Sequence, residues 1–249
     1  MAQPLGIYIH IPFCKSKCDY CDFYSLAGRE DAMDRYQKAL LSHIKTLAPF
    51  LKGRPVDTID FGGGTPSYYG EKRLREVLSS LLRHFSVNRS AEITLECNPD
   101  SVDLRSMAKL RRAGFNRVSL GMQSADSQQL HCIHRIHTPQ QVSDAVQDIR
   151  RARFDNFSLD LIYGLPGQTM VDWERTLAAA IYLEPDHISC YGLKVEPNTP
   201  LSLRVEEGLE LPDGDAQADL YLRAVDLLSR FNYRQYEISN FARPGKESR

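Results

Sequence analysis

Several features that would assign this chain to a membrane or secreted class are missing from its 249 residues. No uninterrupted apolar run approaches the roughly 20 residues that a membrane-spanning helix needs. Residues 1–5 contain neither the basic nor the apolar segment of a signal peptide. Three of the six cysteines, Cys97, Cys132 and Cys190, are scattered singly, unlike the framework of a disulfide-rich secreted protein. We therefore expect a cytoplasmic protein without a membrane span.

A strong charge of either sign is also missing. The chain has 31 basic and 32 acidic residues and a formal net charge of −1, so it carries no general field that would attract nucleic acid. Its basic stretches, residues 109–112 and 150–153, are typical of solvated helix faces. We expect no nucleic-acid partner.

The other three cysteines, Cys14, Cys18 and Cys21, lie within eight residues of one another. They follow an apolar, β-branched run at residues 6–11 that predicts a first strand. Thiolates this close in sequence favour zinc, copper(I) or an iron–sulfur cluster. A structural zinc site usually closes four positions, and no second CxxC pair or CxxH is nearby. Three thiolates on a cubane cluster would leave one iron open to a small molecule, although a zinc loop or structural cysteines remain alternatives.

The spacing Cys-x3-Cys-x2-Cys resembles the signature of the radical S-adenosylmethionine (SAM) superfamily. In that superfamily the three cysteines hold a [4Fe–4S] cluster whose open iron binds the amino and carboxylate groups of SAM. The reduced cluster cleaves SAM to a 5′-deoxyadenosyl radical. The resemblance implies an α/β fold, an open, partial (β/α)6 barrel, with functional residues at the C-terminal ends of its strands.

Alternating strand-like and helix-like patterns agree with this fold. Six strand–helix repeats imply a parallel sheet with right-handed crossovers. The predicted strands are residues 6–11, 58–61, 91–96, 116–121, 156–163 and 187–193, and the predicted helices are 30–47, 72–85, 102–113, a stretch from 126, 139–151 and 171–183.

Residues 1–195 are therefore predicted to form the radical SAM core, and residues 196–249 to begin a C-terminal extension. This second segment contains an amphipathic helix at 213–231 and a strand-like run at 236–241. It stops in a loop composition at 243–249, from which we expect the extension to be incomplete and the chain to be truncated.

A glycine-rich segment, residues 62–66 (Gly-Gly-Gly-Thr-Pro), follows the second predicted strand. Glycines let the backbone adopt positive φ and let a ligand approach closely, but the segment lacks the Gly-Lys-Ser/Thr ending of a P-loop. By itself it is equally consistent with a plain tight turn. It resembles the loop of radical SAM proteins that receives the amino group of SAM, in the form found in oxygen-independent coproporphyrinogen III oxidases and their relatives.

Glu96 ends the third predicted strand. A carboxylate at this position can accept hydrogen bonds from ribose hydroxyls, as an acidic residue does for NAD in other folds. The alternative is a solvated strand-end glutamate. Its neighbour Cys97 points to the opposite face and is interpreted as a small core residue.

The resemblance supplies the remaining site residues. Gln123, Arg135 and Asp160 match an amide, a guanidinium and a carboxylate that face the SAM cavity in the oxidase family, although each could instead be a buried structural polar residue. The complete predicted set is Cys14, Cys18 and Cys21 for the cluster, and Tyr8, Tyr20, Gly63, Gly64, Thr65, Glu96, Gln123, Arg135, Asp160 and Lys194 for SAM.

Two departures from the oxidases point to their paralogues, the radical SAM haem chaperones. The oxidases have a fourth cysteine two residues after the triplet, where this chain has Asp22 and Phe23, and they carry a longer segment before the first strand. The first function hypothesis is therefore a haem chaperone that hands haem to an unidentified acceptor protein. The alternative is an enzyme that oxidatively decarboxylates coproporphyrinogen III.

The resemblance implies a [4Fe–4S] cluster and SAM as cofactors, haem as a ligand and an electron donor as a further partner. In the haem chaperones an HNxxYW-type haem motif follows shortly after the stretch that resembles residues 236–245. That motif does not occur in these 249 residues, so we expect this chain to bind haem weakly.

Overall fold

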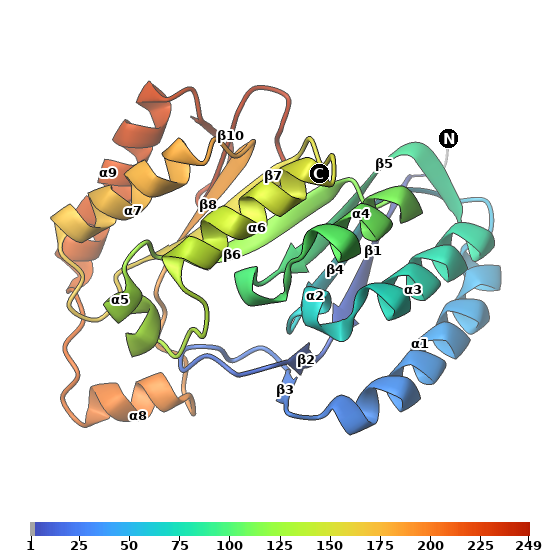
Figure 1. Ribbon diagram of the computed structural model, residues 1–249, viewed down its shortest axis with the longest axis horizontal. Coiled ribbons are helices and arrows are strands. Elements are labelled where there is room, and N and C mark those ends of the chain that lie inside the picture. Colours follow the sequence, from blue (N-terminus) through green and yellow to red (C-terminus); the bar gives the residue numbers. More distant parts are fainter. Residues whose placement is uncertain (1–2) are drawn as a thin grey trace.

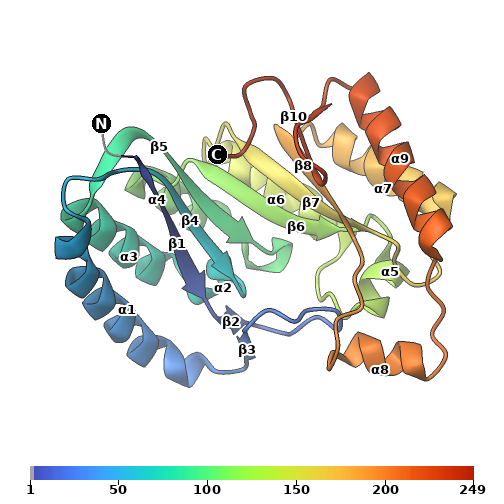
Figure 2. The same ribbon diagram turned by 180° about the vertical axis from the view of Figure 1, so that it is seen from behind.

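The computed structural model describes residues 3–249, which form a curved, open sheet with helices on one face (Figures 1 and 2). The sheet has eight strands in the order β1-β4-β5-β6-β7-β8-β10-β9. The first six in this order are mutually parallel, whereas β10 is antiparallel to β8 and β9 is antiparallel to β10. The strands are β1 (Leu5–Ile11), β4 (Pro55–Gly63), β5 (Ser86–Cys97), β6 (Arg117–Gln123), β7 (Phe157–Tyr163), β8 (His187–Gly192), β9 (Arg234–Gln235) and β10 (Asn240–Ala242).

Six longer helices cover the outer face of the sheet, as Figure 1 shows. They are α1 (Met33–Leu47), α3 (Glu71–His84), α4 (Leu104–Ala113), α6 (Pro139–Arg151), α7 (Met170–Tyr182) and α9 (Gly214–Arg230). The short elements are β2 (Phe13–Cys14), β3 (Leu26–Ala27), α2 (Pro66–Tyr69), α5 (Ser127–Cys132), α8 (Pro200–Glu206) and the 3-10 turns η1 (Glu30–Ala32), η2 (Ala48–Leu51) and η3 (Pro99–Ser101).

Local sequence signals explain where several helices begin and end. The side chain of Asp103 accepts a hydrogen bond from the Ser106 amide and caps α4, and Asp213 caps α9 in the same way. Gly114 ends α4 at a φ of 122°, a conformation that only glycine adopts readily.

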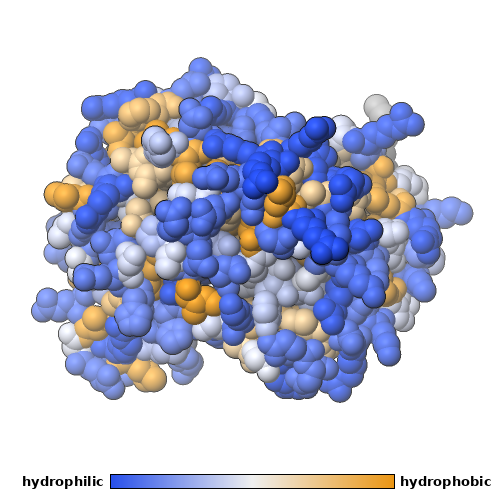
Figure 3. Space-filling model, viewed as in Figure 1, coloured by the Kyte–Doolittle hydropathy of each residue, from blue (hydrophilic) through white to orange (hydrophobic). Residues whose placement is uncertain are grey.

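The sheet separates an apolar layer from a polar one. Alternate residues of the strands point toward the helices, where residues such as Ile59, Phe61 and Leu95 are fully buried. The residues between them, such as Asp60 and Glu96, lie on the opposite, concave face, which no long helix covers (Figure 2). The outer surface over the helices is mostly hydrophilic, with scattered apolar patches (Figure 3).

The six parallel strands and the α/β fold class are confirmed, and their boundaries differ from the predictions by a few residues. The strand predicted at 236–241 is wrong. The structure has a hairpin there, with β9 before the segment and β10 at its end, and residues 237–239 form the bend between them. Within residues 3–249 we find no helix with the length and apolar composition of a membrane span. The predicted division at residue 195 remains a prediction.

Candidate functional site

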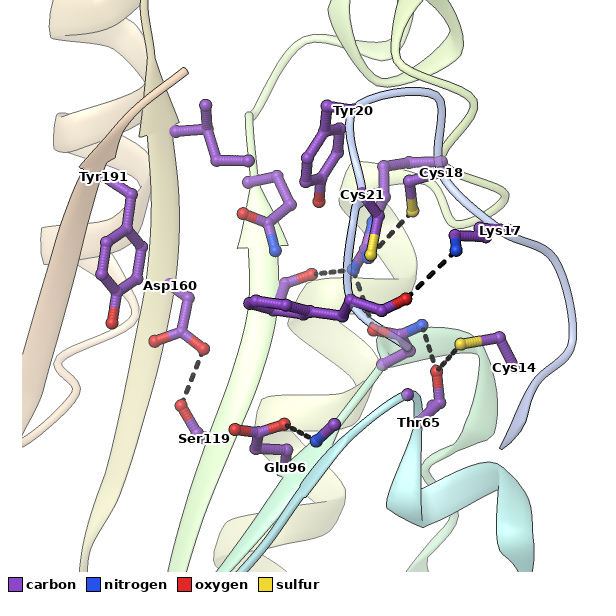
Figure 4. A pocket seen from close by; sticks show the side chains of 18 of the residues that line it. Cys14, Lys17, Cys18, Tyr20, Cys21, Thr65, Glu96, Ser119, Asp160 and Tyr191 are labelled. Carbon is purple, nitrogen blue, oxygen red and sulfur yellow. Dashed lines mark hydrogen bonds between the residues drawn. The ribbon is translucent and has the colours of Figure 1, made fainter. Parts of the chain in front are cut away.

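A cavity of about 450 Å³ opens at the C-terminal ends of the parallel strands, and we call it the site cavity (Figure 4). Its walls come from the cysteine-containing segment, the glycine loop after β4 and the ends of β5 to β8. It is lined by Cys14, Ser16, Lys17, Cys18, Tyr20, Cys21, Phe23, Gly63, Gly64, Thr65, Glu96, Cys97, Asn98, Ser119, Gly121, Gln123, Arg135, Asp160, Ile162, Tyr191, Gly192, Leu193 and Lys194.

All three predicted cluster ligands line this cavity. The three cysteines lie on one segment, residues 13–27, which we call the cysteine loop. The pairing of the short strands β2 and β3 closes the base of this loop. The hydroxyl of Thr65 lies 3.6 Å from the Cys14 sulfur, and Arg135 Nη1 lies 3.5 Å from the Cys18 sulfur. Burial raises the pKa of the Cys21 thiol. No sulfur atom is in a disulfide bond among the six cysteines.

The donor set fits a cubane cluster better than a single ion. Across residues 3–249, no three His, Cys, Asp or Glu side chains are grouped closely enough to hold one metal ion. A cubane instead takes each thiolate on a different iron, so its ligands surround the cluster without converging on one point. Three thiols on one loop at the edge of a cavity, with a guanidinium and a hydroxyl near two of them, suit that arrangement.

The glycine loop is held against the cysteine loop by backbone hydrogen bonds. The amide of Gly64 donates to the Ile11 carbonyl at 2.9 Å, and that of Thr65 donates to the Phe13 carbonyl at 2.8 Å. A Cβ at Gly64 would lie 2.8 Å from the Ile11 carbonyl oxygen and from the amide nitrogen and carbonyl oxygen of Phe13, so the close approach requires glycine. The loop is therefore built to place its backbone beside the cysteines.

Glu96, near the end of β5, lies beside the glycine loop in the site cavity. Its Oε2 accepts a hydrogen bond of 3.1 Å from the Gly63 amide, and a Cβ at Gly62 would lie 2.7 Å from its Oε1. Burial, and then the nearby carboxylates of Asp60 and Asp160, raise the pKa of Glu96 to about 8. A carboxylate with one donor and an open cavity beside it can accept further hydrogen bonds from a ligand.

Gln123 reaches the cavity through an irregular strand end. The pairing of β6 with β7 shifts register between Gly121 and Gln123, and Gln123 has a φ of 63°. A positive φ is costly for a residue with a long side chain, and such residues concentrate at functional sites. The bulge turns this buried amide toward the site cavity.

Arg135 follows α5 and crosses to the ends of β5 and β6. Its Nη2 donates to the Gly121 carbonyl at 2.8 Å and to Asn98 Oδ1 at 2.9 Å. Its Nε is buried and has no hydrogen-bond partner among the described residues, so the guanidinium keeps a donor that the protein does not satisfy. A Cβ at Gly121 would lie 2.7 Å from Nη2, which explains the glycine.

Asp160 pairs with Gly121 across β6 and β7. Its Oδ2 accepts a hydrogen bond of 2.7 Å from Ser119, whose side chain is labelled beside it in Figure 4. Burial raises the pKa of Asp160, and the hydrogen bonds from Ser119 and Ser189 partly offset that rise.

The remaining predicted residues divide into two groups. Tyr20 and Lys194 line the cavity. Burial raises the pKa of Tyr20, and Lys194 forms an ion pair of 2.5 Å with Glu196. Tyr8 is not among the described residues that line the cavity; it is 56% exposed on β1, and its hydroxyl lies 3.1 Å from His10 Nδ1.

Sequence reasoning missed several cavity residues. Asn98, whose amide contacts Thr65 at 3.3 Å, directly follows the Glu96–Cys97 pair and could have been found as a strand-end polar residue. Ser119 alternates with Gly121 along β6, so the period of a strand places both on one face. No pattern in the sequence around Tyr191 indicated that it lines the cavity.

A second cavity of about 230 Å³ lies on the same face, toward the N-terminal ends of the strands, and we call it the floor cavity. It shares Glu96, Ser119 and Tyr191 with the site cavity. Its other lining residues are Thr58, Ile59, Asp60, Glu92, Thr94, Arg117, Ser158, His187, Ser189, Asn240, Ser248 and Arg249.

An open parallel α/β barrel with three cysteines, a glycine loop and an acidic strand end around one cavity defines a protein of the cluster-dependent, SAM-binding class. Residues 8–180 match the Radical SAM superfamily description. The chain belongs to the radical SAM superfamily, which implies a [4Fe–4S] cluster and SAM.

Within the radical SAM superfamily, the chain is similar to proteins named as haem chaperones. The chain is 39% identical over 251 residues to a protein named heme chaperone HemW of Mycobacterium tuberculosis (strain CDC 1551 / Oshkosh), covering 99% of this chain and 64% of that protein. It is 39% identical over 243 residues to heme chaperone HemW of Escherichia coli (strain K12), covering 97% of this chain and 64% of that protein. The chain thus spans less than two thirds of the length of these relatives.

A solved structure agrees with the fold. Coproporphyrinogen III oxidase (HemN) from Escherichia coli, described as a radical SAM enzyme, superimposes with a TM-score of 0.90 at 31% sequence identity. The match covers 98% of this chain and 56% of that chain. The sequence-based resemblance to the coproporphyrinogen oxidase-like family is confirmed.

Proposed function

We propose that this chain carries the cluster- and SAM-binding part of a haem chaperone that transfers haem to an acceptor protein. The observation that carries the proposal is the 39% identity to heme chaperones of two organisms over 97–99% of this chain. Haem as cargo, the acceptor, an electron donor and a cytoplasmic location are all parts of this proposal.

The site residues have separate tasks in it. Cys14, Cys18 and Cys21 hold the cluster, and the backbone of Gly63 and Gly64 faces the amino group of SAM. When bound, a reduced [4Fe–4S] cluster supplies an electron that can cleave the sulfonium bond of SAM.

Four side chains then orient SAM in the cavity. Glu96 accepts hydrogen bonds from the ribose hydroxyls, and Arg135 supplies its unsatisfied Nε–H to an acceptor. Gln123 and Asp160 complete a set of donors and acceptors that can bind a zwitterionic, hydroxyl-bearing ligand.

The alternative is oxidative decarboxylation of coproporphyrinogen III, and the TM-score of 0.90 to the oxidase favours it. Phe23 stands against it, because this apolar ring occupies the place where the resemblance expects a fourth cysteine. The ring is 63% exposed, and the Phe23 carbonyl accepts a hydrogen bond of 3.1 Å from Lys17 Nζ.

Two assays on the same anaerobically reconstituted protein separate the functions. Haem titration followed by incubation with an apo-haemoprotein should show weak haem binding by this chain, and tighter binding with transfer by a chain extended by a relative's C-terminal segment. Incubation with coproporphyrinogen III, SAM and a reductant should give no vinyl product. Conversion of coproporphyrinogen III over many turnovers, without haem transfer, would overturn the chaperone proposal. The haem titration includes this extended chain because the present chain spans 64% of the length of its relatives. We expect the chain alone to bind haem weakly.

A further inference from the structure

The residue between two predicted cluster ligands is tied to distant parts of the chain. Asp19 directly follows Cys18, and its backbone amide donates to the Ile133 carbonyl at 3.2 Å. Its backbone carbonyl accepts a hydrogen bond of 2.9 Å from the amide of Leu201 in α8. The tip of the cysteine loop is therefore anchored by hydrogen bonds to α8 and to the residue after α5.

The Asp19 carboxylate completes that anchor, with Arg204 as its nearer partner and His134 Nδ1 at 3.8 Å from Oδ1. Arg204 of α8 donates from Nη1 to Asp19 Oδ2 at 2.9 Å and to the Cys132 carbonyl at 2.5 Å. Its Nη2 lies 3.4 Å from the Cys132 sulfur. The Asp19 side chain is only 17% exposed, so this ion pair is partly shielded from water. One planar guanidinium thus joins the cysteine loop to the last residue of α5.

The cysteine loop and the segment after α5 also meet at Cys18, a predicted cluster ligand. Arg135, three residues after α5, lies with Nη1 at 3.5 Å from the Cys18 sulfur. An apolar cluster supports the junction: Ile133 and Leu201 are fully buried in it, and Tyr20 of the cysteine loop packs against it. A change in the distance between Asp19 and α5 would therefore move Cys18 relative to Arg135.

We propose that Arg204 is a positioning residue for the iron–sulfur site. By bridging Asp19 and Cys132 it fixes the Cys18–Cys21 half of the cysteine loop against Arg135, so that the thiols are held in place before the cluster is assembled. Arg204 lies outside residues 8–180, which match the superfamily, and beyond the predicted core boundary at residue 195. The cluster site then depends on α8 as well as on the barrel. The inference rests on the [4Fe–4S] assignment but not on haem transfer.

The test compares Arg204→Met with Arg223→Met. Arg223 of α9 is a matched control: its side chain is 32% exposed, against 35% for Arg204, and it pairs with Glu174 at 2.6 Å and Asp226 at 2.8 Å, away from the cluster. The first measurement is the rate at which reconstituted protein loses iron to a chelator without oxygen. The second is hydrogen exchange of residues 15–25 in the cluster-free protein. The third is the change that SAM causes in the EPR spectrum of the reduced cluster.

We expect Arg204→Met to lose iron about 10- to 100-fold faster than Arg223→Met, the range for partners that orient metal ligands. It should also exchange faster in residues 15–25 and show an altered EPR response to SAM. Arg204→Lys keeps the charge but not the planar guanidinium, so it should restore only part of the iron retention. Asp19→Asn removes only the ion pair and leaves Arg204 bound to Cys132, so it should lose iron faster than Arg223→Met but more slowly than Arg204→Met.

Equal iron loss and equal exchange in Arg204→Met and Arg223→Met would overturn the inference. If Arg204→Met fails to fold, Asp19→Asn against Arg223→Met decides the question by the same measurements. Failure of the wild type to form a cluster would instead contradict the [4Fe–4S] assignment itself, which separates the two outcomes.

Discussion

The two cavities on the open face of the sheet share Glu96, Ser119 and Tyr191 but differ in what completes them. The site cavity is completed by loops, which bring thiols, a glycine-rich backbone and an arginine with an unsatisfied donor. The floor cavity is completed by the strands themselves and by the last residues of the chain. Neighbouring residues on the same strands therefore contribute to different environments.

Two charged residues of the floor cavity are hydrogen-bonded within the protein. Arg117 is 3% exposed and donates to Asn156 Oδ1 at 3.1 Å. Glu92 accepts hydrogen bonds from the Ser248 hydroxyl at 3.3 Å and the Arg249 amide at 3.1 Å. Burial and then Arg117 lower the pKa of His187 to about 3. Each cavity has a buried nitrogen without a hydrogen-bond partner among the described residues, Arg135 Nε in the site cavity and His187 Nδ1 in the floor cavity. Only the site cavity places thiols beside such a group, so an unpaired polar group alone does not identify a ligand site.

The strongest test of the comparison removes the thiols. Cys14→Ala, Cys18→Ala and Cys21→Ala should each abolish the cluster, because a cubane held by only two protein thiolates loses its anchor. Anaerobic reconstitution of the wild type should give about four irons and four sulfides per chain.

Cys132→Ala is the control for this loss. Its carbonyl still binds Arg204, and its sulfur does not line the site cavity among the described residues, so iron content should stay at the wild-type level. Stoichiometric zinc and no cluster in the wild type would contradict the assignment.

A second test compares Glu96, which both cavities share, with Glu92, which lines only the floor cavity. Glu96→Ala should keep its iron but bind SAM about 10- to 150-fold more weakly, since a hydrogen bond to a charged group contributes roughly 1.5–3 kcal/mol. Glu92→Ala should leave SAM affinity unchanged, because Glu92 lies in the floor cavity. Isothermal titration should be run above the Glu96 pKa of about 8, where the carboxylate is ionised. Equal SAM affinities in Glu96→Ala and the wild type would remove Glu96 from the site.

A third test uses pH. The pKa of Glu96 is raised from 4.5 to about 8, mainly by burial, so between these values the folded protein holds a proton that the unfolded chain has released. The free energy of unfolding should therefore fall as pH rises through this range, by at most about 1.4 kcal/mol per pH unit for one group. Asp60, with its pKa raised by burial to about 6, adds to the fall at lower pH.

Glu96→Gln stays neutral and should remove much of that fall, as measured by urea unfolding of the cluster-free protein between about pH 5 and pH 8. Glu207→Gln, at an exposed position after α8, is the control. If the free energy of unfolding falls equally with pH in wild type and Glu96→Gln, Glu96 does not hold the proton that causes the fall.

The sequence was enough to predict the parallel strands and the two loops that meet at the site cavity, for a physical reason. Glu96 lies one residue before the end of β5, and parallel strands bring such ends to one edge of the sheet. Asp160 lies in the middle of β7, and only the family resemblance pointed to it. The cysteine spacing is equally local. These features depend only on short segments and on the direction of the strands.

Other features depend on contacts that no local pattern encodes. Asp19 and Arg204 are 185 residues apart, so their ion pair is visible only after the fold is known. The β9–β10 hairpin was missed because both strands are only two or three residues long. The floor cavity was missed because its residues alternate with core residues along each strand and look like the solvated side of a sheet.

The smallest expected effect comes from two serines where the cavities meet. Ser119 donates to Asp160 at 2.7 Å, and Ser158 donates to Ser119 at 2.9 Å. Ser158→Ala loses one neutral hydrogen bond and should lower the free energy of unfolding by about 1 kcal/mol, without changing SAM affinity. Ser119→Ala takes a donor from a buried carboxylate, so it should cost about 1–3 kcal/mol and also weaken SAM binding. Urea unfolding and SAM titration of both variants test this. If Ser158→Ala weakens SAM as much as Ser119→Ala does, the two cavities act as one site and the distinction between them is wrong.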